Sequence, residues 1–413
     1  MNYCVEIPAA VAKTNTTCLF AASVPGSDGV DAILLDEMLR AAGLDSIVLA
    51  AVVNERRFSA AKLETFKSAI SISPPNEWYT DQPHSPYSFP KRFARHRWPY
   101  AKQVNRCVEK AKALLKSEQP EQLWIILNSI AMIDAATEIS KLYPGPIVTQ
   151  VWDDVVHLCN QRKLDRFHRQ RTQQRFAALL RRSERLGVIC EEAAQAYSMH
   201  TDASIEIVRH GLCCEPTLPK LDTARTDEFR IGFAGSVYAT DAWNSLQQAL
   251  DSVEWRIDGR QVVLAVAGSR VNLESNSQAN TIFYGWREPI ELQRLLSNCD
   301  CLYLPQSFAS SDANLTRLSF PTKLSSYVST GRPILVHSPT YGSVHRFCKE
   351  HALGTFCATL APDDLISCLM KLAISRDYYR AQAHASSRIA NNVLTHQAFK
   401  QSVRRMLGSE AAS

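Results

Sequence analysis

Residues 319–336 read S-F-P-T-K-L-S-S-Y-V-S-T-G-R-P-I-L-V, with an early proline and a late glycine. Pro321 suits the first positions of a helix because it has no N–H that needs a partner there, and Gly331 is a helix stop. We therefore expect a short helix between these two residues and a buried strand at residues 334–336. The start of that helix would favour an anion such as phosphate, and Lys323 would add a full charge. Helices of this kind are also common in any α/β protein, so the motif needs support from its neighbours.

The length and composition indicate a globular protein with a large core. A chain of 413 residues fits two domains better than one. Hydrophobic residues make up 46% and charged residues 21%, which is ordinary for a globular protein and unlike disordered or collagen-like chains. No segment has the roughly 20 apolar residues of a membrane span, and the N-terminus lacks the pattern of a secretory signal. We expect a cytoplasmic protein.

The twelve cysteines do not follow a metal or disulfide pattern, since none are spaced C-x-x-C. Cys299 and Cys301 flank Asp300 where a helix gives way to a strand. Burial as small hydrophobic side chains explains them better than a metal site does. We expect reduced thiols and no metal.

The net charge of +5 is unevenly distributed along the chain. Residues 91–106 and 162–185 carry most of the basic surplus, and aromatic residues are interleaved with it: Phe93, Trp98, Tyr100, Phe167 and Phe176. Such stretches suit an anionic membrane surface. They equally suit solvated helix faces whose aromatic residues enter the core. Nucleic acid is not expected as a partner, because no groove-reading motif accompanies the charge.

Strand and helix patterns alternate in the first half. A short apolar run at residues 17–23, a turn at 25–29 and a helical pattern at 30–42 form the opening unit of a doubly wound sheet. Further strands are expected at 46–53, 123–127, 146–151 and 185–190, and further helices at 100–117, 131–142, 163–182 and 191–199. Residues 71–99 are expected to form a long excursion loop.

The alternation stops at a linker and then restarts. We place the linker at residues 212–229, where two prolines and mixed charges interrupt the pattern. Strands are then expected at 230–233, 262–266, 281–284, 301–304 and 334–337, with helices at 241–252, 288–298, 344–350 and 362–372. We expect domains at residues 1–211 and 230–385, and a C-terminal helix within 386–413 that packs back toward the first domain. The carboxyl ends of both sets of strands would face a cleft between the domains.

Four phrases in the second half carry a family resemblance. They are I-G-F-A-G-S-V-Y (231–238), A-V-A-G-S (265–269), I-F-Y-G-W-R-E-P-I-E-L-Q-R-L-L-S-N-C-D-C-L-Y-L-P (282–305) and the opening F-P-T-K-L-S-S-Y-V-S-T-G-R-P-I-L. Their order and spacing resemble the retaining "group 1" (family four) glycosyltransferases, which have the two-Rossmann-domain architecture called GT-B. In the first half the resemblance rests on V-T-Q-V-W-D-D, V-I-C-E-E and V-R-H-G-L. It implies an α/β protein with two doubly wound parallel sheets.

The resemblance also implies roles for individual residues. Family members bind a nucleotide-diphosphate sugar mainly through the second domain and an acceptor mainly through the first. The donor-binding positions implied here are Gly235, Ser236, Gly268, Pro321, Thr322, Lys323 and Ser326, with Lys323 at the diphosphate and Arg270 and Arg287 as further candidates. Asp153 matches an Asp after a first-domain strand and would act as a base or hydroxyl orienter. Helix capping is the alternative role of Asp153 and Asp154.

Two family positions differ in this chain. The family usually carries two Glu eight residues apart, of which the second grips the ribose hydroxyls, and Leu318 and Ser326 stand there. A carboxylate accepts two hydroxyl hydrogen bonds, whereas a serine reaches less far and carries no charge. The sequence also has Trp152 where many relatives have His.

The resulting expectation is a retaining glycosyltransferase of the hexosyltransferase type, without cofactor or metal. Its acceptor would be a carbohydrate or a glycolipid in cell-envelope polysaccharide synthesis, reached from the inner face of the membrane. Two alternatives remain: a non-catalytic GT-B protein that serves as a partner or scaffold, and a nucleotide-sugar epimerase.

Overall fold

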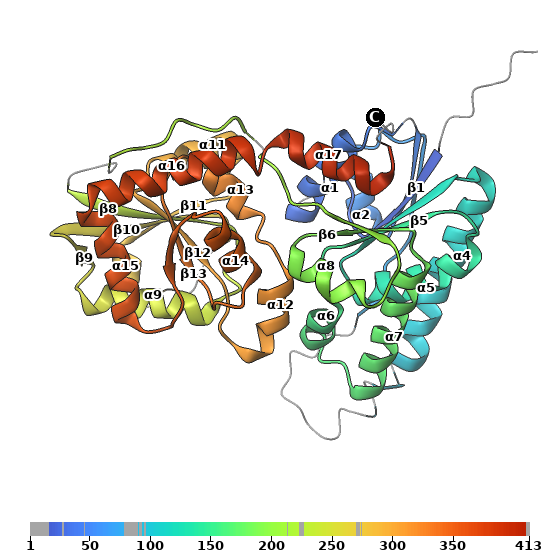
Figure 1. The fold of residues 1–413 in the computed structure, drawn as a ribbon. Helices are drawn as coiled ribbons and strands as arrows, with labels where there is room; N and C mark the ends of the chain where they lie inside the picture. Colours follow the sequence, from blue (N-terminus) through green and yellow to red (C-terminus); the bar gives the residue numbers. More distant parts are fainter. Residues whose placement is uncertain are drawn as a thin grey trace, which may run out of the picture.

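The computed structural model describes residues 16–26, 29–44, 46–77, 90, 93–94, 96–212, 214–222, 227–269, 273 and 275–409. It has two lobes side by side, each built on a parallel sheet with helices on both faces (Figure 1). The predicted α/β class, with two Rossmann-like doubly wound sheets, is confirmed. In the described part of the chain, no helix is both long and apolar enough to cross a membrane.

The first sheet has the strand order β3-β2-β1-β4-β5-β6-β7, and all its pairings are parallel. Its strands are β1 (Thr16–Ala21), β2 (Ser46–Ala51), β3 (Ser68–Ser71), β4 (Gln122–Leu127), β5 (Ile147–Val151), β6 (Arg185–Val188) and β7 (Ser204–Ile207). Its helical segments are α1 (Val30–Ala42), α2 (Glu55–Ser59), η1 (His96–Tyr100), α4 (Ala101–Glu118), α5 (Ile130–Leu142), α6 (Val155–Gln161), α7 (Arg166–Arg182) and α8 (Glu191–Ser198). The order reverses between β1 and β4, and in such sheets the crevice at that point receives ligands.

The second sheet has the order β11-β10-β8-β12-β13-β14, with β9 paired antiparallel to β10. Its strands are β8 (Glu228–Ala234), β9 (Arg256–Ile257), β10 (Arg260–Ala267), β11 (Thr281–Gly285), β12 (Cys301–Pro305), β13 (Ile334–His337) and β14 (Thr355–Cys357). Its helices are α9 (Thr240–Ser252), α10 (Ser275–Ala279), α11 (Pro289–Ser297), η2 (Ser310–Asp312), α12 (Ala313–Leu318), α13 (Lys323–Val328), α14 (Ser343–Glu350), α15 (Pro362–Ile374) and α16 (Arg376–Asn392).

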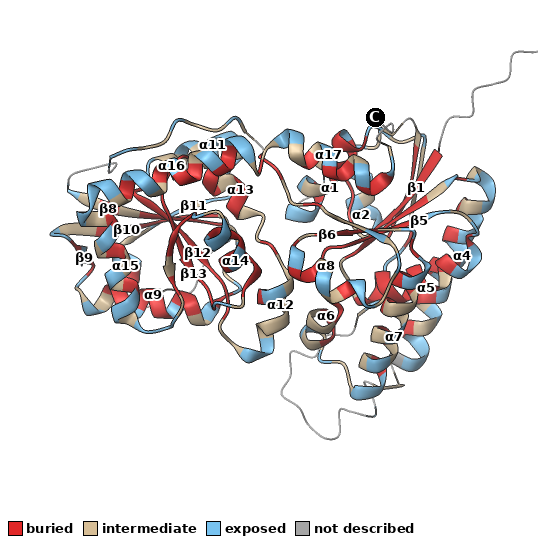
Figure 2. Cartoon of the chain, viewed as in Figure 1, coloured by how far each residue is buried: buried red, intermediate tan, exposed pale blue. Residues whose placement is uncertain are grey.

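The last helix, α17 (His396–Leu407), returns to the first lobe and lies beside α1 (Figure 1). Its apolar face buries Phe399, Val403, Met406 and Leu407 against strand residues of the first sheet such as Trp124. The first lobe therefore depends on a helix that comes almost 200 residues later in the chain. Figure 2 shows that the central strands of both sheets are buried, while many exposed residues lie on the outer helix faces.

Burial also explains the cysteines. Cys299 and Cys301 are buried, and the described cysteines are free thiols. Burial raises the pKa of Cys299 to about 12, so its thiol stays protonated and unreactive. Reduced, core-packed thiols are what the sequence predicted.

Some local predictions were wrong. Residues 163–182 were expected to form one helix, but α6 ends at Gln161 and α7 begins only at Arg166. The break comes from Lys163, which has a positive φ of 49°, and from Asp165, whose carboxylate caps the N–H groups of Phe167 and His168. The strands β3, β7 and β14 were not predicted, because none of them is a continuous apolar run like the equally short β13. Most of the expected excursion loop at 71–99 lies outside the described residues.

Candidate functional site

Tyr327 connects helix α13 to the second sheet by two hydrogen bonds. The buried hydroxyl of Tyr327 accepts a hydrogen bond from the N–H of Ala234 at 2.9 Å and donates one to the carbonyl of Tyr303 at 3.1 Å. These bonds tie the helix to the carboxyl ends of β8 and β12. Lys323 stands four residues earlier, hence on the same side of the helix. The anchor therefore points Lys323 at the end of β8.

The end of α13 is fixed by the interdomain connection. Gly331 has φ +65°, and a Cβ there would lie 2.6 Å from the carbonyl oxygen of Leu218. Thr217 and Lys220 donate backbone hydrogen bonds to the carbonyls of Ser329 and Gly331 at 2.8 and 2.9 Å. The stop that the sequence predicted thus has a physical reason, since only glycine fits both the turn and the close approach.

Lys323 supplies a buried positive charge. Its Nζ is buried and has no hydrogen-bond partner within the described parts of the chain. The ammonium lies 4.3 Å from the ring centre of Phe233 and 5.5 Å from that of Tyr238, so its contacts are with aromatic faces. Burial lowers the pKa of Lys323 to about 8. A cation held in this way, with no hydrogen-bonding anion among the described residues, suits an anionic ligand.

Three glycines leave bare backbone beside this charge. Gly235, Gly268 and Gly285 follow or end the adjacent strands β8, β10 and β11, and all have positive φ (93°, 113° and 66°). A Cβ on Gly268 would lie 2.8 Å from the carbonyl oxygen of Gly235, so side chains are excluded there. Gly268 also donates its N–H to the carbonyl of Gly285 at 2.8 Å. Together they form an uncovered track along the strand ends.

Gly235 and Gly268 of this track, together with Lys323, line a cavity of about 340 Å³ between the lobes. The second lobe contributes most of its lining and α1 of the first lobe contributes an apolar side: Val30, Ile33, Leu34, His210, Ala234, Gly235, Ser236, Tyr238, Ala267, Gly268, Trp286, Arg287, Pro289, Leu292, Thr322, Lys323 and Ser326. Trp286 is 61% exposed and Val30 is 58% exposed. Large apolar side chains exposed on both sides of a cavity are typical of a ligand site.

Most of the predicted donor-binding residues meet in this cavity. Gly235, Ser236, Gly268, Thr322, Lys323 and Ser326 all line it, and so does Arg287. Pro321 does not line it; its carbonyl accepts the N–H of Leu324 at the start of α13. Leu318 ends α12 and also lies outside the lining. Arg270 lies outside the described residues.

Helix α13 is shorter than the motif suggests. It runs for only six residues, and Thr322 at its N-cap makes no side-chain cap. So short a helix has a weak dipole, and the anion preference of this site rests on the charge of Lys323. The expectation of an anion site at the helix start is thereby reduced to the side chain of Lys323.

Asp153 and Asp154 have different environments although they are adjacent. Asp154 caps α6 by accepting the N–H groups of Val156 and His157, both at 3.0 Å, and its other oxygen accepts the hydroxyl of Tyr197 at 3.2 Å. Asp153 makes no such cap. Burial, then the charges of Asp31 and Asp154, raise the pKa of Asp153 to about 7. The capping role expected for both residues thus falls to Asp154.

The position of Asp153 is at the carboxyl end of β5, outside the cavity lining. Asp31, whose charge acts on it, lies in the first turn of α1 next to Val30 of the cavity wall, and it accepts a hydrogen bond from Asn128 at 3.3 Å. A carboxyl group with a pKa near neutrality can exchange protons at physiological pH. Asp153 and Lys323 lie on different lobes, and only Lys323 lines the cavity.

Two histidines, His210 and His157, lie near the contact between the lobes. His210 lines the cavity, its ring pairs with Glu37 of α1, and its carbonyl accepts the hydroxyl of Ser325 at 2.5 Å. His157 of the first lobe lies close enough to Asp312 of the second for their charges to interact. Burial nevertheless lowers the pKa of His157. Both residues have structural partners across the cleft, which accounts for their placement.

Sequence reasoning missed the apolar part of the cavity. Val30, Ile33 and Leu34 belong to a helix that was predicted correctly, but nothing local shows that its first turn faces the second lobe. Trp286 could have been found, because a large aromatic residue directly after the strand end at Gly285 has no place in the core.

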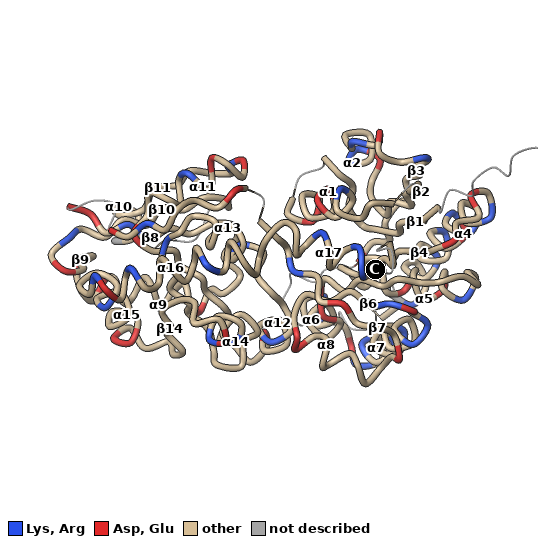
Figure 3. The backbone as a smooth tube through the Cα atoms, turned by 45° about the horizontal axis from the view of Figure 1, so that its top comes forward, with Lys and Arg blue, Asp and Glu red and all other residues tan. Residues whose placement is uncertain are grey.

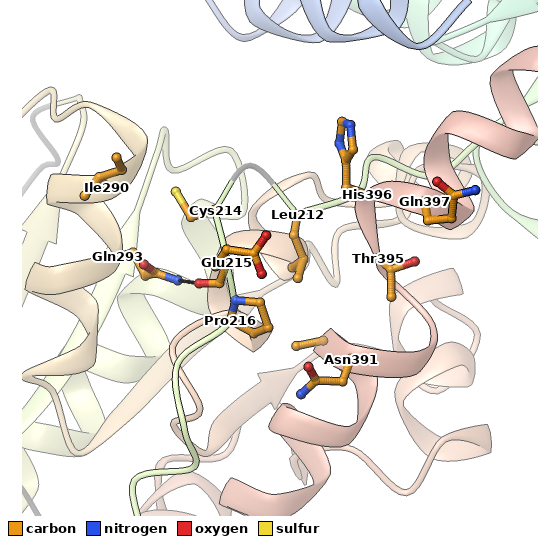
Figure 4. A pocket seen from close by; sticks show the side chains of 11 residues that line it. Leu212, Cys214, Glu215, Pro216, Ile290, Gln293, Asn391, Thr395, His396 and Gln397 are labelled. Atoms are coloured by element: carbon orange, nitrogen blue, oxygen red, sulfur yellow. Dashed lines mark hydrogen bonds between the residues drawn. The ribbon is translucent and has the colours of Figure 1, made fainter.

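A second depression, of about 830 Å³, lies where the chain crosses between the lobes. Figure 4 shows it between the linker residues Leu212–Pro216, α11 and the start of α17, with the amide of Gln293 bonded to the carbonyl of Glu215. The two crossing segments are joined here by Leu212, which donates its N–H to the carbonyl of Leu394 at 3.1 Å. This depression lies where the chain crosses between the lobes, away from the strand ends, and we do not assign it a ligand.

No protein-family model matches the chain, and no curated protein matches it in sequence. Solved structures do match it. Sucrose-phosphate synthase from Thermosynechococcus elongatus is 12% identical with a TM-score of 0.67, over 96% of this chain and 100% of the other. HepE of Anabaena in complex with UDP-glucose is 12% identical with a TM-score of 0.60, over 95% and 100%. The lipopolysaccharide outer core galactosyltransferase WaaB is 13% identical with a TM-score of 0.56, over 96% and 100%. At these identities the likeness shows the fold, which is GT-B.

Proposed function

We propose that the protein is a glycosyltransferase that binds a nucleotide-diphosphate sugar in the interlobe cavity and transfers the sugar to an acceptor hydroxyl. The observation that carries this proposal is the buried ammonium of Lys323, which faces Gly235 and has no hydrogen-bond partner among the described residues. A diphosphate placed there would lie against the charge of Lys323 and the side-chain-free backbone of Gly235. The GT-B fold, which also holds UDP-glucose in HepE, supports this reading.

The chemistry required of the protein is modest. Negative charge accumulates on the leaving diphosphate as the bond to the anomeric carbon breaks, and a fixed cation in a water-poor site stabilises that charge. The rest of the rate enhancement comes from holding the acceptor hydroxyl close to the anomeric carbon. Asp153 would take the hydroxyl proton or orient the hydroxyl. The proposal includes a hexosyl group, retention at the anomeric carbon, and catalysis without a metal.

Titration calorimetry with a panel of nucleotide-diphosphate sugars tests the donor proposal. We expect binding of at least one donor, and we expect Lys323→Met to weaken it while leaving the protein folded. No binding of any donor would favour the alternative of a non-catalytic GT-B protein that acts as a scaffold. A donor that is converted without any added acceptor would instead indicate a nucleotide-sugar epimerase.

For the acceptor we propose a carbohydrate or glycolipid of cell-envelope polysaccharide synthesis, met at an anionic membrane surface. The basic stretches of the first lobe prove to be mixed: Tyr100 and Phe176 are buried, whereas Trp98 is 68% and Phe167 51% exposed. Exposed Arg97 and Arg166 stand next to these two rings in the chain, and Figure 3 shows further basic residues along α7. Exposed aromatic rings among arginines suit an anionic lipid interface.

Sedimentation with liposomes tests this surface. We expect more protein to bind vesicles that contain an anionic lipid than neutral vesicles, and we expect the difference to shrink when Trp98 and Phe167 are both replaced by Ser. Equal sedimentation with both kinds of vesicle would contradict the membrane proposal and leave the donor site untouched.

A further inference from the structure

The cavity has an unusual charge balance for a site that would bind a ribonucleotide. Its described lining contains Lys323, Arg287 and His210 but no aspartate or glutamate. The lining hydroxyl groups are those of Ser236, Tyr238, Thr322 and Ser326. The ring hydroxyl of Tyr238 already accepts the amide of Gln306 at 2.7 Å. Among the described residues, the lining thus offers positive charge and short hydroxyl side chains, and no side-chain carboxylate that would accept two hydroxyl protons at once.

The track between Lys323 and Trp286 indicates how a nucleoside diphosphate would lie. Strands β8, β10 and β11 are neighbours in this order, so the end of β11 lies roughly 10 Å from the end of β8. A diphosphate placed at Lys323 and a base placed against the exposed ring of Trp286 would leave the sugar ring between them, over Gly235 and Gly268. The glycines at these two positions bring no side chain to the ring.

Ser326 is the side chain best placed to reach the ribose edge from below. It stands three residues after Lys323, on the same face of α13, and it lines the same cavity. A serine hydroxyl is one donor and a weak acceptor, and water can replace its bond to a sugar hydroxyl with little cost. Strong discrimination for a hydroxyl group requires a buried protein group that is left unpaired when the hydroxyl is missing. The described lining holds no such acidic group.

We infer that this site does not distinguish ribose from 2′-deoxyribose, so that the donors it accepts include deoxynucleoside-diphosphate sugars. The inference rests on the proposed function, because it concerns the nucleotide part of the donor. It adds a substrate class, and it assigns the lack of selectivity to Ser326 and to the uncovered glycine track. Affinity comes from the diphosphate and the base, and the sugar ring between them is held by shape.

The test compares matched nucleotides that differ by one hydroxyl group. Dissociation constants are measured by calorimetry for UDP and dUDP, ADP and dADP, and GDP and dGDP on the full chain. For the base that binds best, we expect the two constants to agree within about threefold, which is less than one net hydrogen bond contributes at the upper end of its range. A deoxy form that binds more than about tenfold more weakly would overturn the inference while leaving the proposed donor site in place. Failure of all six nucleotides to bind would overturn both this inference and the proposed donor site.

A gain-of-selectivity variant tests the role of Ser326. Ser326→Glu introduces a carboxylate at the ribose edge, and we expect the ratio of deoxy to ribo dissociation constants to rise about tenfold or more. Ser326→Gln has the same size without the charge and should raise the ratio less. The ratio is the readout because the added negative charge repels the diphosphate and so weakens the binding of the ribo and deoxy forms equally. An unchanged ratio in Ser326→Glu would contradict the placement of the ribose beside Ser326.

Discussion

At the scale of single residues, the charge state of Lys323 should control anion binding. Burial lowers its pKa to about 8, so in the free protein it is protonated below that pH and progressively neutral above it. We expect nucleoside-diphosphate affinity to be flat from pH 6.5 to 7.5 and to fall above pH 8. Lys323→Arg keeps its charge over this range and should remove the pH dependence. Titrations at closely spaced pH values check this, and a flat profile for the wild type would contradict it.

The same burial of Lys323 should lower the stability of the protein without ligand. Because its pKa in the folded state is lower than in the unfolded chain, stability rises with pH between about 8 and 10.5 as the folded protein loses the proton. Lys323→Met should therefore stabilise the free protein at pH 7 by on the order of 2–3 kcal/mol. It should also weaken nucleotide binding by roughly 1.5–3 kcal/mol. Urea unfolding and calorimetry on the same variant check the two opposite effects.

Replacing Asp153 and replacing Asp154 by alanine should change the stability of the protein in opposite directions. The raised pKa of Asp153 means that stability is lost as pH rises from about 4 to about 7, so the penalty is fully present at pH 8. Asp153→Ala should stabilise the protein at pH 8 by on the order of 2 kcal/mol, with little effect at pH 4. Asp154→Ala removes the α6 cap and should cost about 1–2 kcal/mol. Unfolding curves at both pH values check this, and the same sign for both variants would refute it.

At the scale of elements, the turn after β10 should tolerate only glycine. Gly268 and Gly259 both have positive φ, so a Cβ strains the backbone at either site by roughly 1–2 kcal/mol. At Gly268 the Cβ would also lie 2.8–3.0 Å from backbone atoms of Gly235, whereas at Gly259 nothing lies within 4 Å. Gly268→Ala should cost at least about twice as much stability as Gly259→Ala and should also weaken nucleotide binding. Thermal unfolding and nucleotide titration of both variants test this, and equal losses would show that the track does not depend on the close approach.

The elements also show what the sequence could predict. Long or sharply bounded elements such as α1 and β13 were predicted to the residue, because their apolar periods and end signals agree. Short strands such as β7 have no period to read and are defined only by their pairing partners. Gly235, Gly268 and Lys323 were predicted from the same kind of signal as β13, since proline and glycine signals are local.

The remaining part of the site depends on distant contacts. That Val30 faces the cavity follows from how the two lobes meet, and that Asp154 caps a helix while Asp153 does not follows from side-chain rotamers. Neither property leaves a signal in the local sequence. The apolar wall of the cavity is therefore what the structure adds to the site.

At the scale of the whole molecule, the lobes are joined by more than their linker. Arg209 of the first lobe lies between the rings of Phe320 and Phe347 of the second, 5.1 and 5.0 Å from their centres, and Arg346 pairs with Glu192 at 3.3 Å. These contacts join the lobes in addition to the two chain segments that cross between them. A donor bound between Lys323 and α1 would add further contacts between the two lobes.

The return of α17 should make the first lobe depend on the end of the chain. Phe399 is buried against the first sheet, and replacing a buried Phe by Ala costs about 3–5 kcal/mol. We expect Phe399→Ala to lower hydrogen-exchange protection in β1, β4 and β5 while the second-lobe strands β8, β10 and β12 keep theirs. Gln401→Ala, on the exposed face of the same helix, is the control and should change neither. Equal loss of protection in both lobes would contradict this prediction. It would show that the contacts between the lobes make the molecule unfold as one cooperative unit.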